Sequence, residues 1–267
     1  MTARSYGYHA RANGVRLHLL RYGERGPRLL LLPGITSPAI TWGFVAERLA
    51  KHFDVHVLDF RGRGLSWSAP GMDASLEAMA SDVIGLLQTL DWTEVTVLGH
   101  SMGARVAIRA AARNPERMSQ LLLIDPPVSG PGRRDYPSKL PWYVESIRLA
   151  NQGVSAEDLR AFAPTWTEEQ LRLRAEWLHT CDEGAVVQAY RGFHEDDIHA
   201  DLPKLTTPGL LMAAGRGGVI EPGDLAEIKA LAPALVQCTA ANAGHMVPWD
   251  DEADFYRLLG DYLKVEF

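Results

Sequence analysis

The residues best suited to covalent catalysis stand at positions 99–103, which read Gly-His-Ser-Met-Gly. An apolar, partly β-branched run precedes them at 95–98, and residues 104–112 carry small and apolar side chains at helical spacing without Pro or Gly. Strand, sharp turn and helix in that order are the setting of a nucleophile elbow, which exposes a serine hydroxyl at the C-terminal end of a strand. We therefore expect Ser101 to be a nucleophile. The N–H of Met102, at the start of the helix, should face the group that Ser101 attacks.

The rest of the chain predicts a parallel sheet that can position this turn. A hairpin signal at 8–22 opens the pattern, and buried apolar runs then alternate with helical segments. The expected strands are 29–32, 55–59, 95–98, 121–125, 210–214 and 235–239, and the expected helices are 38–49, 75–90, 104–112, 222–231 and 251–263. Such short strand–helix units indicate an α/β fold with a mostly parallel, doubly wound sheet.

The alternation of strands and helices stops at Pro126 and Pro127. Residues 128–203 are aromatic, basic and helical in pattern, and they contain no convincing strand. We therefore expect an inserted helical cap at 128–203, above a core formed by residues 1–127 and 204–267.

The overall composition argues against several classes of function. The 267 residues are 46% hydrophobic and carry a net charge of −6 without a concentrated Lys/Arg stripe, so no nucleic-acid partner is expected. The sequence shows no signal-peptide pattern and no apolar run of membrane length, which favours a cytoplasmic protein without membrane contact. Cys181 and Cys238 lack metal-ligand spacing and should be free thiols. His194 and His199 flank an acidic run, and we expect them on a solvated surface and not as metal ligands.

The whole chain resembles the α/β-hydrolase fold in its order of elements: an early hairpin, an elbow after the fifth strand, a cap after the sixth and a histidine after the last. In that family the catalytic triad follows the chain order Ser, acid, His. The resemblance implies that His245, within Ala-Gly-His-Met at 243–246, takes the Ser101 proton and returns it to the leaving group.

The triad acid departs from the commonest pattern of the family. Most members carry it in Gly-x-x-Asp after the strand that follows the cap, but residues 215–218 read Gly-Arg-Gly-Gly, with Gly218 in the Asp position. A minority carry the acid at the end of the preceding strand, where this chain has Asp125, and a buried carboxylate there needs a partner such as a histidine N–H. We assign Asp125 as the acid. Glu221 stays the alternative, although it is more simply a first-turn acid of the next helix.

Backbone amides should form the oxyanion hole. The His-Gly-x of the family reads Pro-Gly-Ile at 33–35, and the resemblance implies that the Ile35 N–H is the second donor beside Met102. The nearby loop Arg-Gly-Arg-Gly at 61–64 resembles a loop of the family whose arginine is usually structural and pairs with nearby carboxylates, and we favour this role over contact with the substrate.

Serine at the elbow favours acyl transfer to water through a tetrahedral intermediate, without a cofactor. A closer resemblance covers the stretches 35–45, 125–134, 136–142, 174–181 and 214–222. They are similar to the N-formylmaleamate deformylases of aerobic nicotinate degradation. The resemblance implies hydrolysis of N-formylmaleamate, a small acidic amide, to maleamate and formate by Ser101, Asp125 and His245 through a formyl-enzyme.

The carboxylate of such a substrate requires a cation or a hydroxyl in the site. The candidates are Thr36, Arg133, Arg134, Arg174 and Arg216. We favour Arg216, because it follows a core strand at the catalytic edge, although an ion pair with a cap carboxylate is an equal alternative. Trp142 is a further candidate, but large cap aromatics more often supply packing area.

Two alternative functions stay open at this point. One is another serine hydrolase of small acidic compounds, such as a C–C bond hydrolase or a carboxylesterase. The other is a ligand-binding receptor that keeps the hydrolase scaffold with little turnover. The intact Ser, His and acid argue against the receptor.

Overall fold

One sheet of eight strands organises the computed structural model, which describes residues 5–267. The strands are β1 Ser5–Ala12, β2 Val15–Tyr22, β3 Arg28–Leu32, β4 Asp54–Asp59, β5 Val95–His100, β6 Met118–Ile124, β7 Gly209–Ala214 and β8 Leu235–Ala240. Their order is β1-β2-β4-β3-β5-β6-β7-β8. The pairs β1–β2 and β2–β4 are antiparallel and all others are parallel, which confirms the predicted hairpin and mostly parallel sheet.

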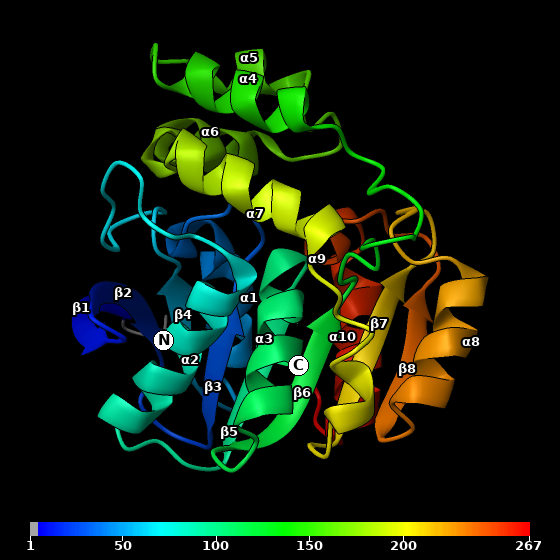
Figure 1. Cartoon of the computed structure of the whole chain (residues 1–267). Coiled ribbons are helices and arrows are strands. Elements are labelled where there is room, and N and C mark those ends of the chain that lie inside the picture. Colours follow the sequence, from blue (N-terminus) through cyan, green and yellow to red (C-terminus); the bar gives the residue numbers. More distant parts are fainter. Residues whose placement is uncertain (1–4) are drawn as a thin grey trace.

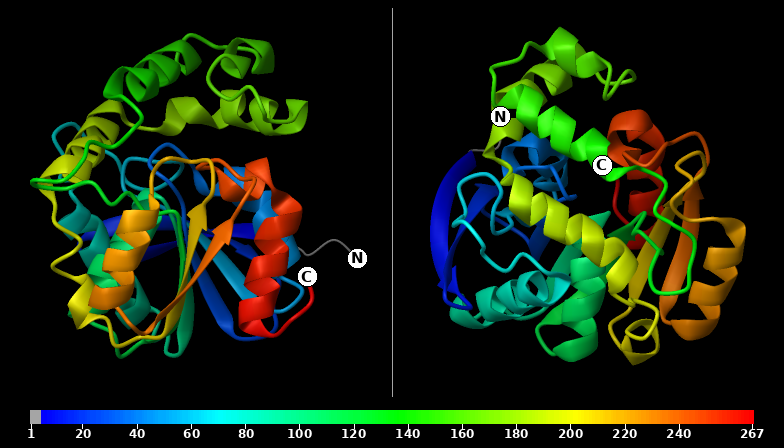
Figure 2. Two further views of the ribbon diagram at one scale, coloured as in Figure 1. Left: turned by 90° about the vertical axis from the view of Figure 1, so that its right-hand side faces the viewer. Right: turned by 45° about the horizontal axis from the view of Figure 1, so that its top comes forward.

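Helices cover both faces of this sheet (Figures 1 and 2). They are α1 Gly43–Leu49, α2 Leu76–Thr89, α3 Met102–Arg113, α4 Leu140–Ala150, α5 Ala156–Arg160, α6 Glu168–Trp177, α7 Glu183–Glu195, α8 Pro222–Leu231, α9 Val247–Asp250 and α10 Glu252–Leu263, with short 3-10 turns at Ala39–Trp42, Leu178–Thr180 and Leu202–Lys204. α2, α3 and α8 lie on one face, and α1 and α10 lie on the other. There the Tyr256 hydroxyl of α10 donates to the Val45 carbonyl of α1.

Three strands of the sheet are buried along their whole length. Every residue of β4, β5 and β7 is buried, and Leu29, Leu30 and Leu31 of β3 are 0% exposed. The continuous apolar run at 29–32 suits β3 because helices cover both faces of the sheet. Since β5, β6 and β7 are parallel, the residues that follow them meet at one edge of the sheet.

The chain between β6 and β7 forms a separate layer above the carboxyl edge of the sheet (Figure 1). α4 to α7 belong to this layer. Capping boxes at Ser155 and Thr167 begin α5 and α6, because each side chain and its partner three residues later satisfy free N–H groups at the helix start. We keep residues 128–203 as the proposed limits of the cap.

Arg105, on α3, joins the two ends of this layer to the core. Its buried guanidinium donates to the carbonyls of Pro127 and Ser129 at 2.8 and 2.9 Å. It also donates to the carbonyls of Gly192 and Asp196 at 3.0 and 2.7 Å. Burial lowers the pKa of Arg105 to about 10. One side chain therefore satisfies backbone acceptors both where the chain leaves the core and where it returns.

Two details differ from the sequence-based expectation. The four-residue helix α9 was not predicted, because a segment this short, with Pro248 inside it, carries no helical period. His199 is buried and not solvated. Its ring lies between two carboxylates, with Nδ1 3.8 Å from Asp197 Oδ1 and Nε2 4.0 Å from Glu227 Oε2.

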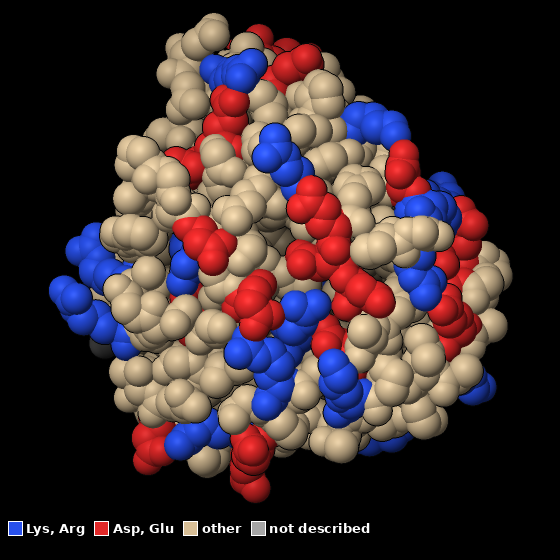
Figure 3. All heavy atoms as spheres, viewed as in Figure 1, with Lys and Arg blue, Asp and Glu red and all other residues tan. Residues whose placement is uncertain are grey.

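The surface and the cysteines follow the composition. Figure 3 shows basic and acidic side chains interspersed over the visible face. Cys181 and Cys238 are free thiols, as predicted. None of the helices in residues 5–267 combines the length and the apolar character needed to cross a bilayer.

Candidate active site

Ser101 lies in the tight turn between β5 and α3. Its backbone, with φ 53° and ψ −119°, is strained for a residue other than glycine. A Cβ on Gly103 would overlap the carbonyl of Leu32 on β3, and a Cβ on Gly99 would overlap the backbone at the start of α3. The Ser101 N–H donates to the Ile124 carbonyl at 2.9 Å, which holds the turn against β6.

A continuous chain of hydrogen bonds joins Ser101, His245 and Asp125. Ser101 Oγ is 2.9 Å from His245 Nε2, and His245 Nδ1 is 2.7 Å from Asp125 Oδ2. Because a carboxylate can only accept, Nδ1 carries the ring proton and Nε2 is free to accept the serine proton. Such a chain can deprotonate the hydroxyl during attack and stabilise the imidazolium that results.

The Asp125 carboxylate is held firmly at the end of β6. The residue is fully buried and has a φ of 45°, a left-handed conformation in which aspartate is enriched. Oδ1 accepts the Ala214 N–H at 3.1 Å, and the Asp125 N–H donates to the Met212 carbonyl at 2.8 Å. These contacts with β7 leave Oδ2 for His245.

Glu221, the alternative acid, has a different task. It begins α8, where its N–H donates to the Asp224 carboxylate at 2.7 Å. Its exposed carboxylate lies 3.8 Å from the Arg134 guanidinium. The position of the usual family acid, Gly218, has a φ of +65° and faces open space. The geometry favours Asp125 as the acid.

Two backbone donors are available beside Ser101. No acceptor within residues 5–267 is bound by the N–H of Ile35 or of Met102. Met102 also begins α3, where the helix dipole favours negative charge. The buried Arg63 donates to the Ile35 carbonyl at 3.1 Å and to the Ala185 carbonyl at 3.3 Å, which fixes the loop that carries Ile35. The pair of amides can stabilise an oxyanion.

The two loop arginines are structural in different ways. Arg61 pairs with Asp82 through hydrogen bonds of 2.6 and 2.5 Å, which confirms its predicted partner type. Arg63 differs from the prediction, because it contacts backbone carbonyls and forms no ion pair within residues 5–267, and burial lowers its pKa to about 10.

His100 supports the position of His245. Its Nε2–H donates to the His245 carbonyl at 2.9 Å, and its ring lies 5.3 Å from that of Trp42. Burial is the largest of the causes that lower the pKa of His100 to about 3. The ring is therefore neutral at ordinary pH, and it packs against Trp42 and holds the His245 backbone.

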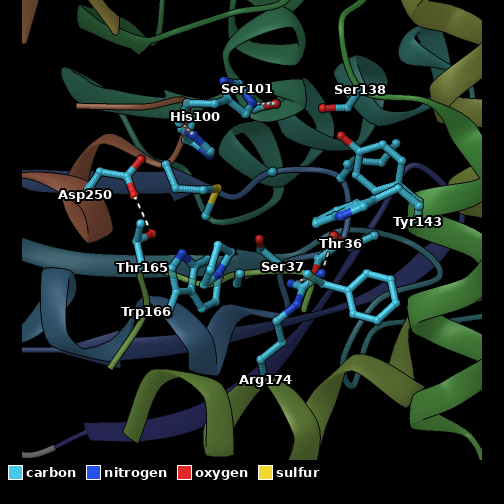
Figure 4. Close-up of a pocket in the computed structure, with 18 residues that line it drawn as sticks. Thr36, Ser37, His100, Ser101, Ser138, Tyr143, Thr165, Trp166, Arg174 and Asp250 are labelled. Carbon is cyan, nitrogen blue, oxygen red and sulfur yellow. Dashed lines mark hydrogen bonds between the residues drawn. The ribbon is translucent and has the colours of Figure 1, made fainter. Parts of the chain in front are cut away.

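A cavity of about 230 Å³ opens over Ser101 (Figure 4). The sheet side contributes Ile35 and Thr36, whereas the layer of α4 to α7 contributes a set of aromatic side chains. These are Trp142, Tyr143, Phe162 and Trp166. Hydroxyl, imidazole, guanidinium and carboxylate groups share the wall with these aromatics, so the cavity combines apolar surface with polar groups, as small-molecule sites do.

Three predicted substrate-binding arginines lie away from the lining of this cavity. Arg216, the favoured candidate, is exposed and donates to the Asn242 carbonyl. Arg133 forms two hydrogen bonds with Glu227, at 2.8 and 2.6 Å. Both guanidinium groups therefore bind protein acceptors outside the cavity.

Arg134 is the third of them, and it binds the start of α8. It donates to the carbonyls of Gly218 and Val219 and to the Asp224 carboxylate. Of the remaining candidates, Thr36, Trp142 and Arg174 do line the cavity.

Tyr136 is a polar group of the site that the sequence did not single out. Its hydroxyl lies 3.3 Å from His245 Nε2 and accepts a hydrogen bond from the Tyr143 hydroxyl at 3.2 Å. Burial is the main cause that holds the pKa of Tyr136 well above its ordinary value, so the phenol stays protonated. A Tyr in an aromatic cap segment gives no sign in the sequence of which hydroxyl meets the catalytic edge.

The chain is similar to a known protein family and to several known proteins. A family model described as "alpha/beta hydrolase fold" matches residues 27–252. The N-formylmaleamate deformylase of Pseudomonas putida KT2440 is 58% identical over 257 residues, covering 96% of each chain. The crystal structure of the N-formylmaleamic acid deformylase Nfo from Pseudomonas putida S16 is 56% identical, covers 95% of this chain and all of that one, and has a TM-score of 0.92. The resemblance predicted from the sequence is confirmed.

More distant matches share the fold. The 2-(acetamidomethylene)succinate hydrolase of Mesorhizobium japonicum is 27% identical, covering 83% of this chain and 82% of the relative. A solved structure of E-2-(acetamidomethylene)succinate hydrolase is 22% identical, with a TM-score of 0.80 over 98% of this chain and all of that one.

Proposed function

Because this chain belongs to the alpha/beta hydrolase fold family, we propose that it is a serine hydrolase that converts N-formylmaleamate to maleamate and formate. The observation that carries the proposal is the hydrogen-bonded Ser101–His245–Asp125 chain in the wall of a cavity. The 58% identity to a deformylase supports the choice of substrate.

The first half of the reaction forms a formyl-enzyme. Ser101 Oγ attacks the formyl carbon while His245 Nε2 takes the hydroxyl proton, and the Ile35 and Met102 N–H groups bind the resulting oxyanion. The C–N bond then breaks, and His245 gives its proton to the departing nitrogen, which leaves as the neutral amide of maleamate. The second carbonyl on that nitrogen makes it a better leaving group than a simple amine.

The second half releases formate. A water molecule attacks the formyl ester as His245 takes its proton. The tetrahedral intermediate then collapses as His245 returns that proton to Ser101 Oγ, which frees the serine and releases formic acid, which ionises to formate. Asp125 stabilises the imidazolium in both halves through its contact with Nδ1. This scheme needs no cofactor. The cavity of about 230 Å³ supports a small substrate, since pockets for drug-sized ligands measure roughly 300–1,000 Å³.

The direct test is to incubate the purified protein with N-formylmaleamate and to quantify formate and maleamate. We expect both products in equal amounts. Short p-nitrophenyl esters and a vinylogous diketone serve as competing substrates. Faster turnover of either one, with no formate from N-formylmaleamate, would replace the deformylase by a carboxylesterase or a C–C bond hydrolase. Binding without any product would indicate a receptor.

Replacing Tyr136 by phenylalanine should lower kcat for formate release about tenfold, the equivalent of one hydrogen bond of about 1.4 kcal/mol. The reason is the loss of a protonated hydroxyl 3.3 Å from His245 Nε2, the atom that exchanges a proton with Ser101 in this scheme. Steady-state kinetics across pH 6–9 would measure the change. Tyr190→Phe is the matched control, because that hydroxyl donates to the Ser138 carbonyl in the same aromatic cluster. Equal kcat values for Tyr136→Phe and the wild type would remove Tyr136 from the reaction.

A further inference from the structure

Arg174, on α6, is the one Lys or Arg among the described residues that line the cavity over Ser101. Its side chain is only 5% exposed. Within residues 5–267 it has no carboxylate within ion-pair distance, in contrast to Arg133 and Arg134. The cavity therefore contains a buried positive charge without a protein counter-ion.

The contacts of Arg174 leave most of its hydrogen-bonding capacity unused. Its guanidinium donates to the Thr36 carbonyl and to Thr36 Oγ1, both at 3.4 Å. These bonds are long compared with the usual 2.7–3.2 Å. A guanidinium has five N–H donors, and the others have no acceptor in the part of the protein that is described.

Two indole rings hold the charge in place without neutralising it. Arg174 Cζ lies 5.7 Å from the ring centre of Trp142 and 5.6 Å from that of Trp166. Cation–π contacts of this kind orient a guanidinium and leave its N–H edge free for a planar acceptor.

The acidic group in the cavity lining is engaged elsewhere. Asp250 accepts a hydrogen bond from the Thr165 hydroxyl at 3.2 Å, and burial is the main cause that raises its pKa. Figure 4 shows the Asp250–Thr165 pair apart from Arg174. An unpaired buried charge is costly, so the missing partner of Arg174 is best supplied by a ligand.

We propose that Arg174, assisted by the Thr36 hydroxyl, binds a carboxylate of the substrate, so that the site selects short linear acyl amides with a free carboxylate on the leaving group. The proposal rests on the proposed function, in which this carboxylate belongs to the maleamate part. Figure 4 shows Arg174 and Ser101 on opposite sides of the cavity. This separation allows Arg174 to bind the carboxylate at one end of the substrate while Ser101 attacks the formyl group at the other end. Thr36 directly follows the oxyanion donor Ile35, so the anchored end and the reacting end are held by one loop.

The kinetic test compares Arg174→Met and Arg174→Lys with the wild type, with Arg133→Met as the matched control outside the cavity. We expect Arg174→Met to lower kcat/KM for N-formylmaleamate by about 100-fold or more, mainly through KM, with partial recovery in Arg174→Lys. Hydrolysis of neutral p-nitrophenyl acetate should stay within about threefold, because the triad is untouched. An equal loss on both substrates would show a structural role and overturn the proposal.

A binding measurement keeps this test separate from the deformylase assignment. Isothermal titration of the wild type should detect maleamate but not the neutral maleamide, and Arg174→Met should lose the maleamate signal. Circular dichroism would check that each variant is folded. If Arg174→Met does not fold, Arg174→Lys supplies the variant for the comparison. If the wild type binds maleamate but makes no formate, the deformylase proposal fails and the anion site stands. If Arg174→Met binds maleamate as tightly as the wild type, the anion site fails whatever the activity.

Discussion

Replacing Ser101 by alanine should reduce kcat for formate release by about six orders of magnitude, down to the rate supported by binding and the oxyanion donors alone. The substitution removes only the hydroxyl group, whose oxygen would form the bond to the formyl carbon. Its hydrogen bond to His245, at 2.9 Å, is lost with it. Formate quantified over long incubations at high enzyme concentration would measure the residual rate.

The control for this variant is Ser129→Ala, which removes a buried hydroxyl that has no hydrogen-bond partner within the described chain. It should stay within about threefold of the wild-type kcat. Rapid quenching of the wild type followed by mass spectrometry should also find one formyl group on the peptide that contains Ser101. Formate release above one per cent of wild type by Ser101→Ala would require another nucleophile.

Replacing Asp125 by asparagine should reduce kcat by about four orders of magnitude. An asparagine oxygen can still accept the Ala214 N–H that Asp125 Oδ1 accepts at 3.1 Å, so the fold is preserved. Its amide group faces His245 Nδ1 with a donor, however, and this favours the ring tautomer that cannot accept the Ser101 proton. The neutral asparagine side chain also lacks the negative charge that stabilises the imidazolium.

Glu221→Gln is the matched control for the acid assignment. This change also removes one carboxylate, but at the exposed start of α8, and kcat should stay within about twofold. Thermal melting of both variants would separate a loss of chemistry from a loss of folding. A large loss in Glu221→Gln, with an active Asp125→Asn, would reverse the assignment of the acid.

The sheet and the elbow could be predicted because their signals are local. The apolar run at 29–32 and the small residues after Gly103 report burial and close approach one element at a time. Helix α8 was predicted at the bounds that it has in the structure, since Pro222 and two acidic residues mark its start.

The ranking of the candidate substrate-binding residues could not be predicted in the same way, because it depends on which side chains the folded chain brings together. Arg216 follows a core strand, as the sequence suggested, but its guanidinium turns back to the Asn242 carbonyl. Arg174 is remote in sequence from every strand, yet α6 brings it to the cavity. The Tyr136 hydroxyl is a similar case. The sequence shows that Tyr136 is an aromatic residue of the cap. Its contact with His245 arises only from the way the cap packs on the core.

The four carbonyls around Arg105 have a consequence for how such proteins diversify. Pro127 and Ser129 lie at one end of the layer above the sheet, Gly192 and Asp196 at the other, and all four face a single guanidinium. The two ends of the layer are therefore joined to the core through one side chain. A genetic exchange of the intervening residues that keeps these four carbonyls in place would preserve this junction with α3 while the wall of the cavity changes. Such an exchange would also have to restore the other contacts between the layer and the core, such as that of Arg63 with the Ala185 carbonyl.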